Sequence, residues 1–129
     1  MSKYRLGLRS LTRLRGVHPD LVKVVKRAIE ITEVDFTVLE GVRTKARQRE
    51  LLKKGATRTM NSRHLTGHAV DLGAYVGGTV RWDWPLYHKI AHAMKTAGKE
   101  LGIEIEAGAD WTRFPDGPHF QLPWGYDLS

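Results

Sequence analysis

Two segments of the sequence hold histidine and aspartate at spacings that suit metal binding. Residues 62–71 contain His64 and Asp71, and Gly67 between them permits a tight turn of the backbone. Residues 116–119 begin 45 positions after Asp71 and end on His119. Catalytic zinc sites combine three protein ligands with one position open to water, and two His plus one carboxylate is a known ligand set. The two segments therefore indicate a candidate metal site at His64, Asp71 and His119.

Two further residues suggest what such a site would do. Asp116 precedes His119 by three residues across a Gly-Pro turn, which keeps its carboxylate near the ligands without forcing it to coordinate. As general base it would take a proton from an attacking water, which zinc activates, and pass it to a leaving amine. Arg43, at the end of a predicted strand, is placed to stabilise the oxyanion. The chemistry is metal-assisted hydrolysis of an amide, although isolated His and Asp residues also serve as surface and capping residues.

A second pair of histidines, His88 and His92, is four residues apart, which puts both rings on one face of a predicted helix. Zinc proteases with this spacing have Glu directly after the first His, whereas this chain has Lys89, which cannot act as a base. The pair lies opposite the apolar stripe of its helix. We therefore interpret it as part of a solvated cationic face.

The candidate residues must be positioned by a small set of helices and strands. Apolar stripes and capping residues predict helices over residues 19–31, 45–54 and 85–101. Alternating, β-branched and aromatic segments predict strands over residues 35–40, 68–72, 79–82, 103–107 and 119–122. An exposed loop over residues 56–63 leads to the first motif. The order favours an α+β fold, a single compact domain with about three helices and a small, mostly antiparallel sheet.

Length and composition limit the class of protein and the kind of metal site. The 129 residues are 41% hydrophobic and 27% charged, as in an average soluble domain that can bury a core. The absence of cysteine excludes a disulfide scaffold, a thiol nucleophile and any zinc site with Cys ligands. Any metal must therefore be held by His and carboxylates.

The net charge of +7 predicts an anionic partner: nucleic acid, an acidic membrane surface or an acidic wall polymer. Lys and Arg are spread over the chain with modest clustering near residues 43–63, and no nucleic-acid-binding signature is present, so we expect no nucleic-acid partner. Arg9 and Arg13 interrupt the only segment resembling a secretory signal. No apolar run approaches the ~20 residues needed to span a bilayer, so we expect no membrane insertion.

Taken together, the two motifs resemble those of a known enzyme family. The matching positions are Ser62-x-His64-x-x-Gly67-x-Ala69-x-Asp71 and then Asp116-x-x-His119. They resemble the zinc peptidases that include D-alanyl-D-alanine carboxypeptidases and dipeptidases and the bacteriophage L-alanyl-D-glutamate endopeptidases. Residues 35–44, 97–103 and 108–111 look like the phage endolysin branch. The resemblance covers most of residues 35–122 and implies cleavage of the peptidoglycan stem peptide between L-alanine and D-glutamate.

The resemblance implies a role for each candidate residue. It makes one Zn²⁺ the cofactor and His64, Asp71 and His119 its ligands. It makes Asp116 the general base and Arg43 a clamp for the transition state or for a substrate carboxylate. Ser62 is then expected to contact substrate or to steady its loop, and Trp111 is expected to bind substrate as a wall of the cleft. A plain turn serine and a core tryptophan remain the alternatives.

The resemblance also implies a setting. We expect residues 1–129 to form a single zinc peptidase domain, without a separate cell-wall-binding domain, that works as a monomer. Lacking a signal, it would be made in the host cytoplasm and reach the wall in the periplasm through a separate pore, as an endolysin in host cell lysis. The alternatives are a D,D-carboxypeptidase that removes terminal D-alanine, a basic nucleic-acid-binding protein or nuclease, and a structural metal site, which three ligands disfavour.

Overall fold

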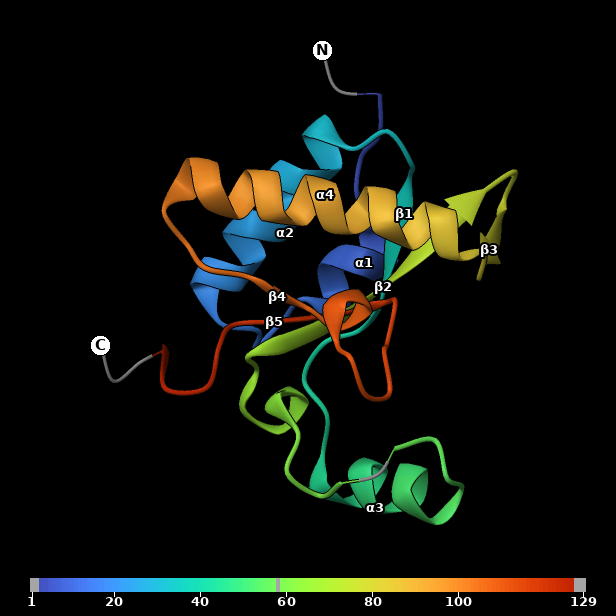
Figure 1. Ribbon diagram of the computed structural model, residues 1–129, viewed down its shortest axis with the longest axis vertical. Helices are drawn as coiled ribbons and strands as arrows, with labels where there is room; N and C mark the ends of the chain where they lie inside the picture. The colour runs from blue at the N-terminus through green and yellow to red at the C-terminus, as the bar shows by residue number, and fades with distance from the viewer. Residues whose placement is uncertain (1–2, 58, 127–129) are drawn as a thin grey trace.

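A central antiparallel sheet joins the segments that carry the candidate residues, in a computed structural model that describes residues 3–57 and 59–126 (Figure 1). The helices are α1 (Leu8–Arg13), α2 (Pro19–Ile31), α3 (Lys45–Lys53) and α4 (Trp84–Leu101). The strands are β1 (Phe36–Glu40), β2 (Ala69–Val76), β3 (Thr79–Arg81), β4 (Glu106–Ala107) and β5 (His119–Gln121). The strand order is β1-β2-β5-β4, with β3 paired to β2, and all these pairs are antiparallel. The predicted α+β class is confirmed.

All three predicted helices are present, and capping residues stand at their ends as expected. Before α2, the Nδ1 atom of His18 accepts a hydrogen bond from the backbone N–H of Asp20, and Pro19 occupies the first turn. At the start of α3, the hydroxyl of Thr44 accepts from the backbone N–H of Arg47 at 3.1 Å. The α4 helix ends at Gly102 in the left-handed conformation.

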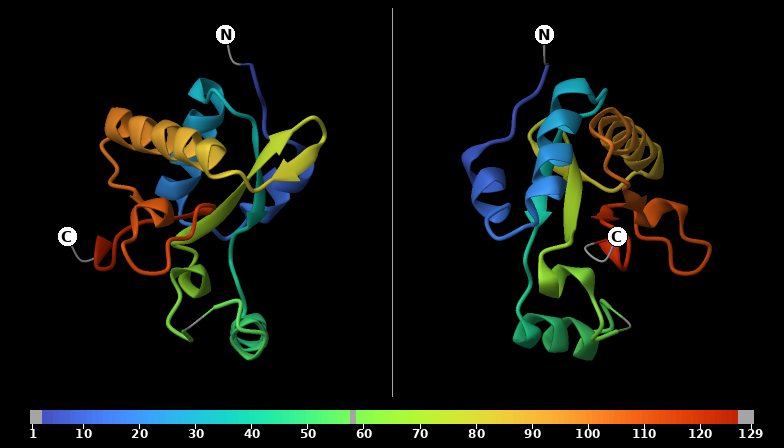
Figure 2. Two further views of the ribbon diagram at one scale, coloured as in Figure 1. Left: turned by 45° about the vertical axis from the view of Figure 1, so that its right-hand side comes forward. Right: turned by 90° about the vertical axis from the view of Figure 1, so that its left-hand side faces the viewer.

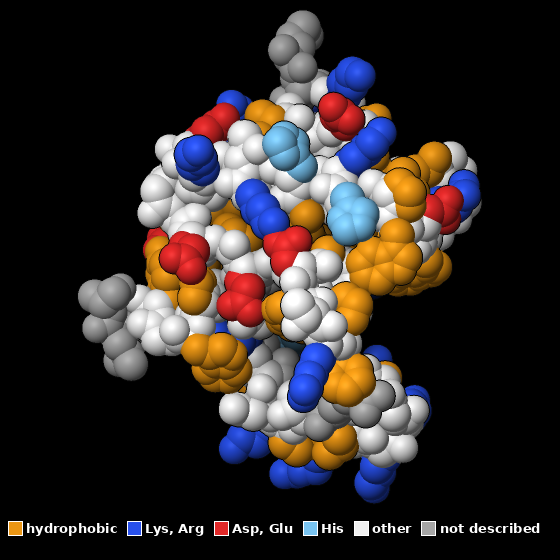
Figure 3. All heavy atoms as spheres, viewed as in Figure 1, with side chains coloured by type: hydrophobic (Ala, Val, Ile, Leu, Met, Phe, Trp, Pro, Cys, Tyr) orange, Lys and Arg blue, Asp and Glu red, His pale blue; other side chains and the backbone are white. Residues whose placement is uncertain are grey.

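Helix α3 belongs to a lobe that is set off from the rest of the molecule. This lobe, residues 43–63, leaves the sheet after β1 and returns just before β2, and all views place α3 at the end opposite to α2 and α4 (Figures 1 and 2). The space-filling view shows the lobe as a separate protrusion below the body (Figure 3). Within the described ranges, no helix combines the length and the apolar character needed to cross a bilayer.

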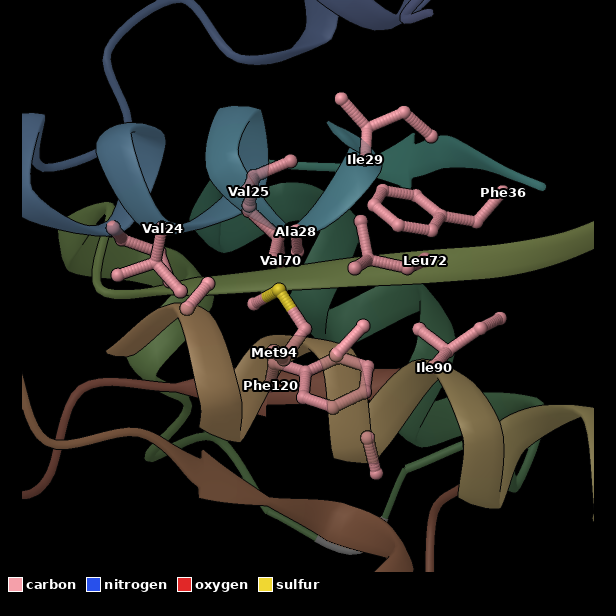
Figure 4. Packing of buried hydrophobic residues seen from close by; sticks show 14 of the residues in the cluster. Val24, Val25, Ala28, Ile29, Phe36, Val70, Leu72, Ile90, Met94 and Phe120 are labelled. Atoms are coloured by element: carbon pink, nitrogen blue, oxygen red, sulfur yellow. The ribbon is translucent and has the colours of Figure 1, made fainter. Parts of the chain in front are cut away.

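The hydrophobic core lies between the sheet and the pair α2 and α4, which pack against each other (Figure 4). Helix α2 contributes Val24, Val25, Ala28 and Ile29, β2 contributes Val70 and Leu72, α4 contributes Ile90 and Met94, and β5 contributes Phe120. Each fully buried side chain of this size stabilises the fold by roughly 1.5–3 kcal/mol. The core therefore fixes β2 and β5, which carry two of the candidate ligands.

Three details differ from the expectations. Helix α1 was not predicted; it packs on β1, where the hydroxyl of Ser10 accepts a hydrogen bond from the backbone N–H of Val38 at 2.9 Å. The predicted strand over residues 103–107 is reduced to β4, because the N–H of Ile103 instead bonds the carbonyl of Gly98 at 2.8 Å and closes the end of α4. Arg63 is buried rather than part of an exposed loop.

We predict that Gly67→Ala destabilises the protein by more than about 2 kcal/mol. Gly67 has φ +78°, and an added Cβ would lie 2.6 Å from the carbonyl oxygen of Gly16. Gly77→Ala is the matched control, because Gly77 has φ +62° but open space around its Cβ position. Urea unfolding of both variants measures the difference. Equal losses in the two variants would show that the contact with Gly16 has no energetic effect.

Candidate active site and metal centre

Two of the candidate ligands are direct neighbours across the sheet. In the register of β2 and β5, Asp71 pairs with His119, and on the other side of β2 the same Asp71 pairs with Glu40 of β1. Side chains directly opposite each other on antiparallel strands point to the same face with their Cβ atoms about 5 Å apart. The sheet register therefore brings Asp71 and His119 together from positions that are distant in sequence.

The third candidate ligand, His64, reaches the same point from the short 3-10 helix η1 (Arg63–Thr66). The hydroxyl of Ser62 caps this helix by accepting a hydrogen bond from the backbone N–H of His64 at 3.2 Å. Gly67, in the left-handed conformation, turns the chain from η1 into β2. His64 is 1% exposed, so its ring is held in one orientation by its surroundings.

The three side chains direct one oxygen and two nitrogens at a common point, with ligand atoms within 4.8 Å of one another. Asp71 Oδ1 lies 3.2 Å from His64 Nε2 and 3.3 Å from His119 Nδ1. The outer nitrogens face acceptors: His64 Nδ1 lies 2.8 Å from the Gly41 carbonyl oxygen, and His119 Nε2 lies 2.7 Å from Gln121 Oε1. These acceptors place the protons of neutral rings on the outer nitrogens, so the inner nitrogens of neutral rings have lone pairs available for a cation held beside the carboxylate. Three such donors around one point fit a divalent cation such as zinc.

The charges of the site favour an ionised Asp71. Burial by itself would raise the pKa of this carboxyl, but the protonated forms of His119 and His64 donate hydrogen bonds to it, and these bonds together with the ring charges outweigh burial and hold the pKa below its usual range. Burial opposes protonation of His119, yet its hydrogen bonds to Asp71 and Gln121 and the Asp71 charge raise the pKa of its ring. A deprotonated carboxylate is the form that binds a metal.

Asp116 lies beside this group without belonging to it. A tight turn holds it: its N–H donates to the carbonyl of Gly108 at 2.9 Å, and its carbonyl accepts from the N–H of His119 at 3.2 Å. Loss of solvent and the negative charge of Asp71 raise the pKa of Asp116, against the opposing charges of His119, His64 and Arg43. A carboxylate with a raised pKa is a stronger base, as general-base catalysis requires.

Arg43 is held firmly at the edge of the ligand group, with a side chain that is 9% exposed. Its Nη2 lies 3.5 Å from Asp71 Oδ2, its Nε donates to Glu40, and its Nη1 donates to Gln48 Oε1 at 2.8 Å. Its backbone N–H also donates to the carbonyl of His64 at 3.0 Å. Its cationic group therefore orients and neutralises the Asp71 carboxylate.

The ligands open into a cleft of about 430 Å³, which the lobe borders on one side. Arg43, Ser62, Trp111 and Asp116, the four other sequence candidates, all line it together with the ligands. The indole N–H of Trp111 donates to Glu106 Oε1 at 2.9 Å, and its ring centre lies 5.1 Å from that of His119. The structure thus brings all seven candidate residues to one cleft.

The other histidine pair has no such setting. His88 and His92 are both exposed on α4, in agreement with their interpretation as a solvated helix face. Within the ranges that the structure describes, the group of His, Asp and Glu side chains close enough to hold a metal is His64, Asp71 and His119.

Sequence reasoning missed Gln48, the one fully buried residue of helix α3, which is mostly exposed and basic. Besides accepting from Arg43, its side chain donates from Nε2 to the carbonyl of Thr59 at 2.6 Å. One amide thus joins the guanidinium beside Asp71 to the loop that borders the cleft. A single uncharged polar side chain in a basic helix was the available signal, but it is a weak one, because glutamine is common on exposed helix faces.

We predict that Gln48→Ala destabilises the fold by about 1–3 kcal/mol, because it leaves a buried guanidinium N–H and the Thr59 carbonyl without their partner. We also expect the KM for a substrate that binds in the cleft to rise, since the loop bordering the cleft loses its anchor. Thermal unfolding and steady-state kinetics test both effects. Arg49→Ala, one residue along α3 on its exposed side, is the control; a similar loss in that variant would contradict the assigned role.

Comparisons with known proteins agree on one activity. A family model described as phage L-alanyl-D-glutamate peptidase matches residues 1–122. The L-alanyl-D-glutamate peptidase of Escherichia phage T5 is 36% identical over 117 residues, which cover 88% of this chain and 85% of that protein. The L-alanyl-D-glutamate peptidase of Listeria phage A118 is 31% identical over 122 residues, 92% of this chain but 42% of that longer protein.

A solved structure extends the similarity to three dimensions. The crystal structure of the Serratia marcescens L-Ala D-Glu endopeptidase ChiX superposes with a TM-score of 0.89 at 47% sequence identity. The alignment covers 98% of this chain and 95% of that chain, so the similarity includes the sheet, the helices and the lobe.

Proposed function

Because this chain belongs to the family of phage L-alanyl-D-glutamate peptidases, we propose that it is a zinc-dependent peptidoglycan endopeptidase that cleaves the L-alanyl-D-glutamate bond of the stem peptide. The relatives named above carry the same specificity in their names. The observation that carries the zinc dependence is the convergence of His64, Asp71 and His119 on one point with their electron pairs directed inward.

The proposed roles follow from where each side chain lies. His64, Asp71 and His119 would hold one Zn²⁺, and when bound the ion supplies a Lewis acid that activates water and polarises the scissile carbonyl. The outer hydrogen bonds from His64 to Gly41 and from His119 to Gln121 keep the two rings in the required tautomer and orientation.

Asp116 is the proposed general base and, later, general acid. Its raised pKa lets its carboxylate take a proton from the attacking water and then deliver that proton to the amine of D-glutamate as the amide bond breaks. The tight turn through Gly108 and His119 holds the backbone of Asp116 in a fixed place beside the ligands.

The remaining cleft residues are proposed to bind the substrate. Arg43 stabilises negative charge that develops on the scissile carbonyl or on a substrate carboxylate, from a position fixed by Glu40 and Gln48. Ser62 keeps η1 capped and faces the cleft, and Trp111 forms part of the cleft wall beside His119.

For the biological setting, we propose a phage endolysin that acts as a monomer in host cell lysis. The enzyme would be made in the host cytoplasm and would reach peptidoglycan in the periplasm through a separate membrane pore. Two of the relatives are phage peptidases, which supports this setting.

The test is to incubate the purified protein with peptidoglycan, with and without a chelator, and to identify the new termini by mass spectrometry. We expect chelator-sensitive release of L-alanine carboxyl ends and D-glutamate amino ends, restored when zinc is added back. Release of free D-alanine instead would identify a D,D-carboxypeptidase. An absence of products under all conditions, or full activity in the chelator, would contradict the proposal.

A further inference from the structure

The net positive charge of this chain is confined to the lobe. Residues 43–63 hold eight Lys and Arg against a single acidic residue, Glu50, so their net charge of +7 equals that of the whole chain. The remaining residues carry equal numbers of basic and acidic side chains. Both signs contribute to this contrast, because Lys and Arg are concentrated in the lobe and Asp and Glu are nearly absent from it.

The lobe presents this charge mainly on helix α3. Arg43 and Arg63 point inward, where Arg63 donates to the carbonyls of Leu122 and Pro123 at 3.2 and 2.7 Å. The basic residues of α3 and its C-cap are all exposed: Lys45, Arg47, Arg49, Lys53 and Lys54. Lys and Arg side chains surround the lobe in the space-filling view (Figure 3).

Of the five exposed cations of α3 and its C-cap, two share one acidic residue and three do not. Arg47 and Lys54 both pair with Glu50 at 2.9 Å. Lys45, Arg49 and Lys53 follow one another at intervals of four residues, so they form one stripe along the helix. Within the described ranges, this stripe has no ion pair with any acidic group.

The stripe lies on the side of α3 that faces away from the cleft, but the lobe that carries it borders the cleft. Leu51 of α3 and the following loop residues Thr57, Thr59 and Asn61 line the cleft together with the candidate ligands. A polymer much larger than the cleft, with one stem peptide bound in it, would extend beyond the cleft and over the neighbouring lobe. Peptidoglycan is such a polymer, and its neighbouring stem peptides carry free carboxylates.

We propose that the stripe of Lys45, Arg49 and Lys53 binds carboxylates of the peptidoglycan around the stem peptide that is being cut. The inference rests on the proposed function, because that function brings the polymer to the cleft. Exposed charge pairs are individually weak, but several on one surface raise the residence time and the encounter rate of an anionic partner. The lobe thus holds the enzyme on the wall between cuts.

Two other anionic partners fit the lobe less well. Residues 43–63 contain no aromatic side chain, and single-stranded nucleic acid binding relies on aromatic side chains between the cations. A membrane-surface helix needs a continuous apolar face, whereas α3 offers Leu51 and Leu52, the first of which faces the cleft.

The test compares two triple variants with equal changes in charge. The first carries Lys45→Gln, Arg49→Gln and Lys53→Gln; the matched control carries Lys23→Gln, Lys26→Gln and Lys99→Gln, three exposed lysines of α2 and α4. Binding to insoluble purified peptidoglycan is measured by sedimentation in an Asp116→Ala background, which preserves the polymer during the assay. Hydrolysis is measured in the native background with whole peptidoglycan and with a soluble muropeptide monomer.

We expect the lobe variant to bind peptidoglycan about tenfold more weakly at about 50 mM salt, with the difference lost near 500 mM, where charges are screened beyond about 4 Å. Hydrolysis of whole peptidoglycan should fall with binding, while kcat/KM for the muropeptide monomer stays unchanged. Peptidoglycan whose carboxylates have been amidated should bind native protein as weakly as the lobe variant binds the untreated polymer. The control variant should behave like the native protein.

Equal binding of peptidoglycan by the lobe and control variants would overturn the inference. So would a lobe variant that binds peptidoglycan normally and loses only its binding to a DNA duplex or to phosphatidylglycerol vesicles in parallel sedimentation assays. An equal fall in muropeptide hydrolysis would also overturn it, because the effect would then arise in the cleft. Failure of the proposed function is distinguishable from these outcomes: native protein would release no termini from either substrate, whereas the binding comparison needs no hydrolysis.

Discussion

Asp116→Ala is expected to slow hydrolysis of the stem peptide by about 10²–10⁴-fold, the usual contribution of a positioned general base. The same variant should keep its zinc, because the group that converges on the metal point consists of His64, Asp71 and His119 and does not include Asp116. Steady-state hydrolysis of a muropeptide and zinc content after dialysis measure the two effects together. The combination of an intact metal site and lost turnover is what separates a base from a ligand.

Asp110→Ala provides the control for this prediction. Asp110 lies in the short helix η2 (Gly108–Asp110), is exposed, and pairs with Lys95 at the surface. We expect that variant to retain both zinc and turnover. Zinc loss from Asp116→Ala would mean that Asp116 is itself a ligand, and unchanged turnover would mean that another group accepts the proton.

His119→Ala has the second large expected effect, the loss of both zinc and hydrolysis. Substitutions of groups that merely orient a ligand cost about 10–100-fold in metal affinity, so the loss of a direct ligand should exceed about 100-fold. The variant also leaves Asp71 without the partner that lies 3.3 Å away and helps to keep its pKa low. Zinc titration followed by calorimetry, together with the hydrolysis assay, measures the change.

His92→Ala is the control for His119→Ala, because His92 is exposed on α4. It should bind zinc and hydrolyse peptidoglycan as the native protein does. Retention of zinc by His119→Ala at native affinity would contradict the proposed ligand set, whatever happened to the rate.

Much of the fold was predictable because its signals are local. The apolar stripes and caps of α2 and α4 predicted the bounds of those helices to within one residue, and Gly102 marked the end of α4. Helix α1 was missed because six residues offer little periodicity, and it is stabilised by its hydrogen bonds to β1, a tertiary effect. Strand β4 was predicted too long because alternation alone does not show that a hydrogen bond from Ile103 closes the helix before it.

The residues that give the candidate site its chemistry were predictable, but the strand pairing and the hydrogen bonds that position them were not. His64, Asp71, Asp116 and His119 stand in two short motifs, so their types and spacing are visible in the chain. The pairing of β1, β2 and β5 that brings these motifs together is not visible, because strand register depends on contacts between distant segments. The same holds for Gln48, whose role depends on hydrogen-bond partners that only the folded chain brings to it.

The register of β5 on β2 ties catalytic competence to correct folding. His119 and Gln121 face the cleft, and Phe120 between them is fully buried. A slip of one residue would turn both polar side chains into the core and expose the phenyl ring. Such a chain would lose both the convergence of the three candidate ligands and the burial of the Phe120 side chain. A stably folded but inactive isomer with shifted strands is therefore not expected to accumulate. Specific activity should therefore track the folded fraction closely in any preparation of this enzyme.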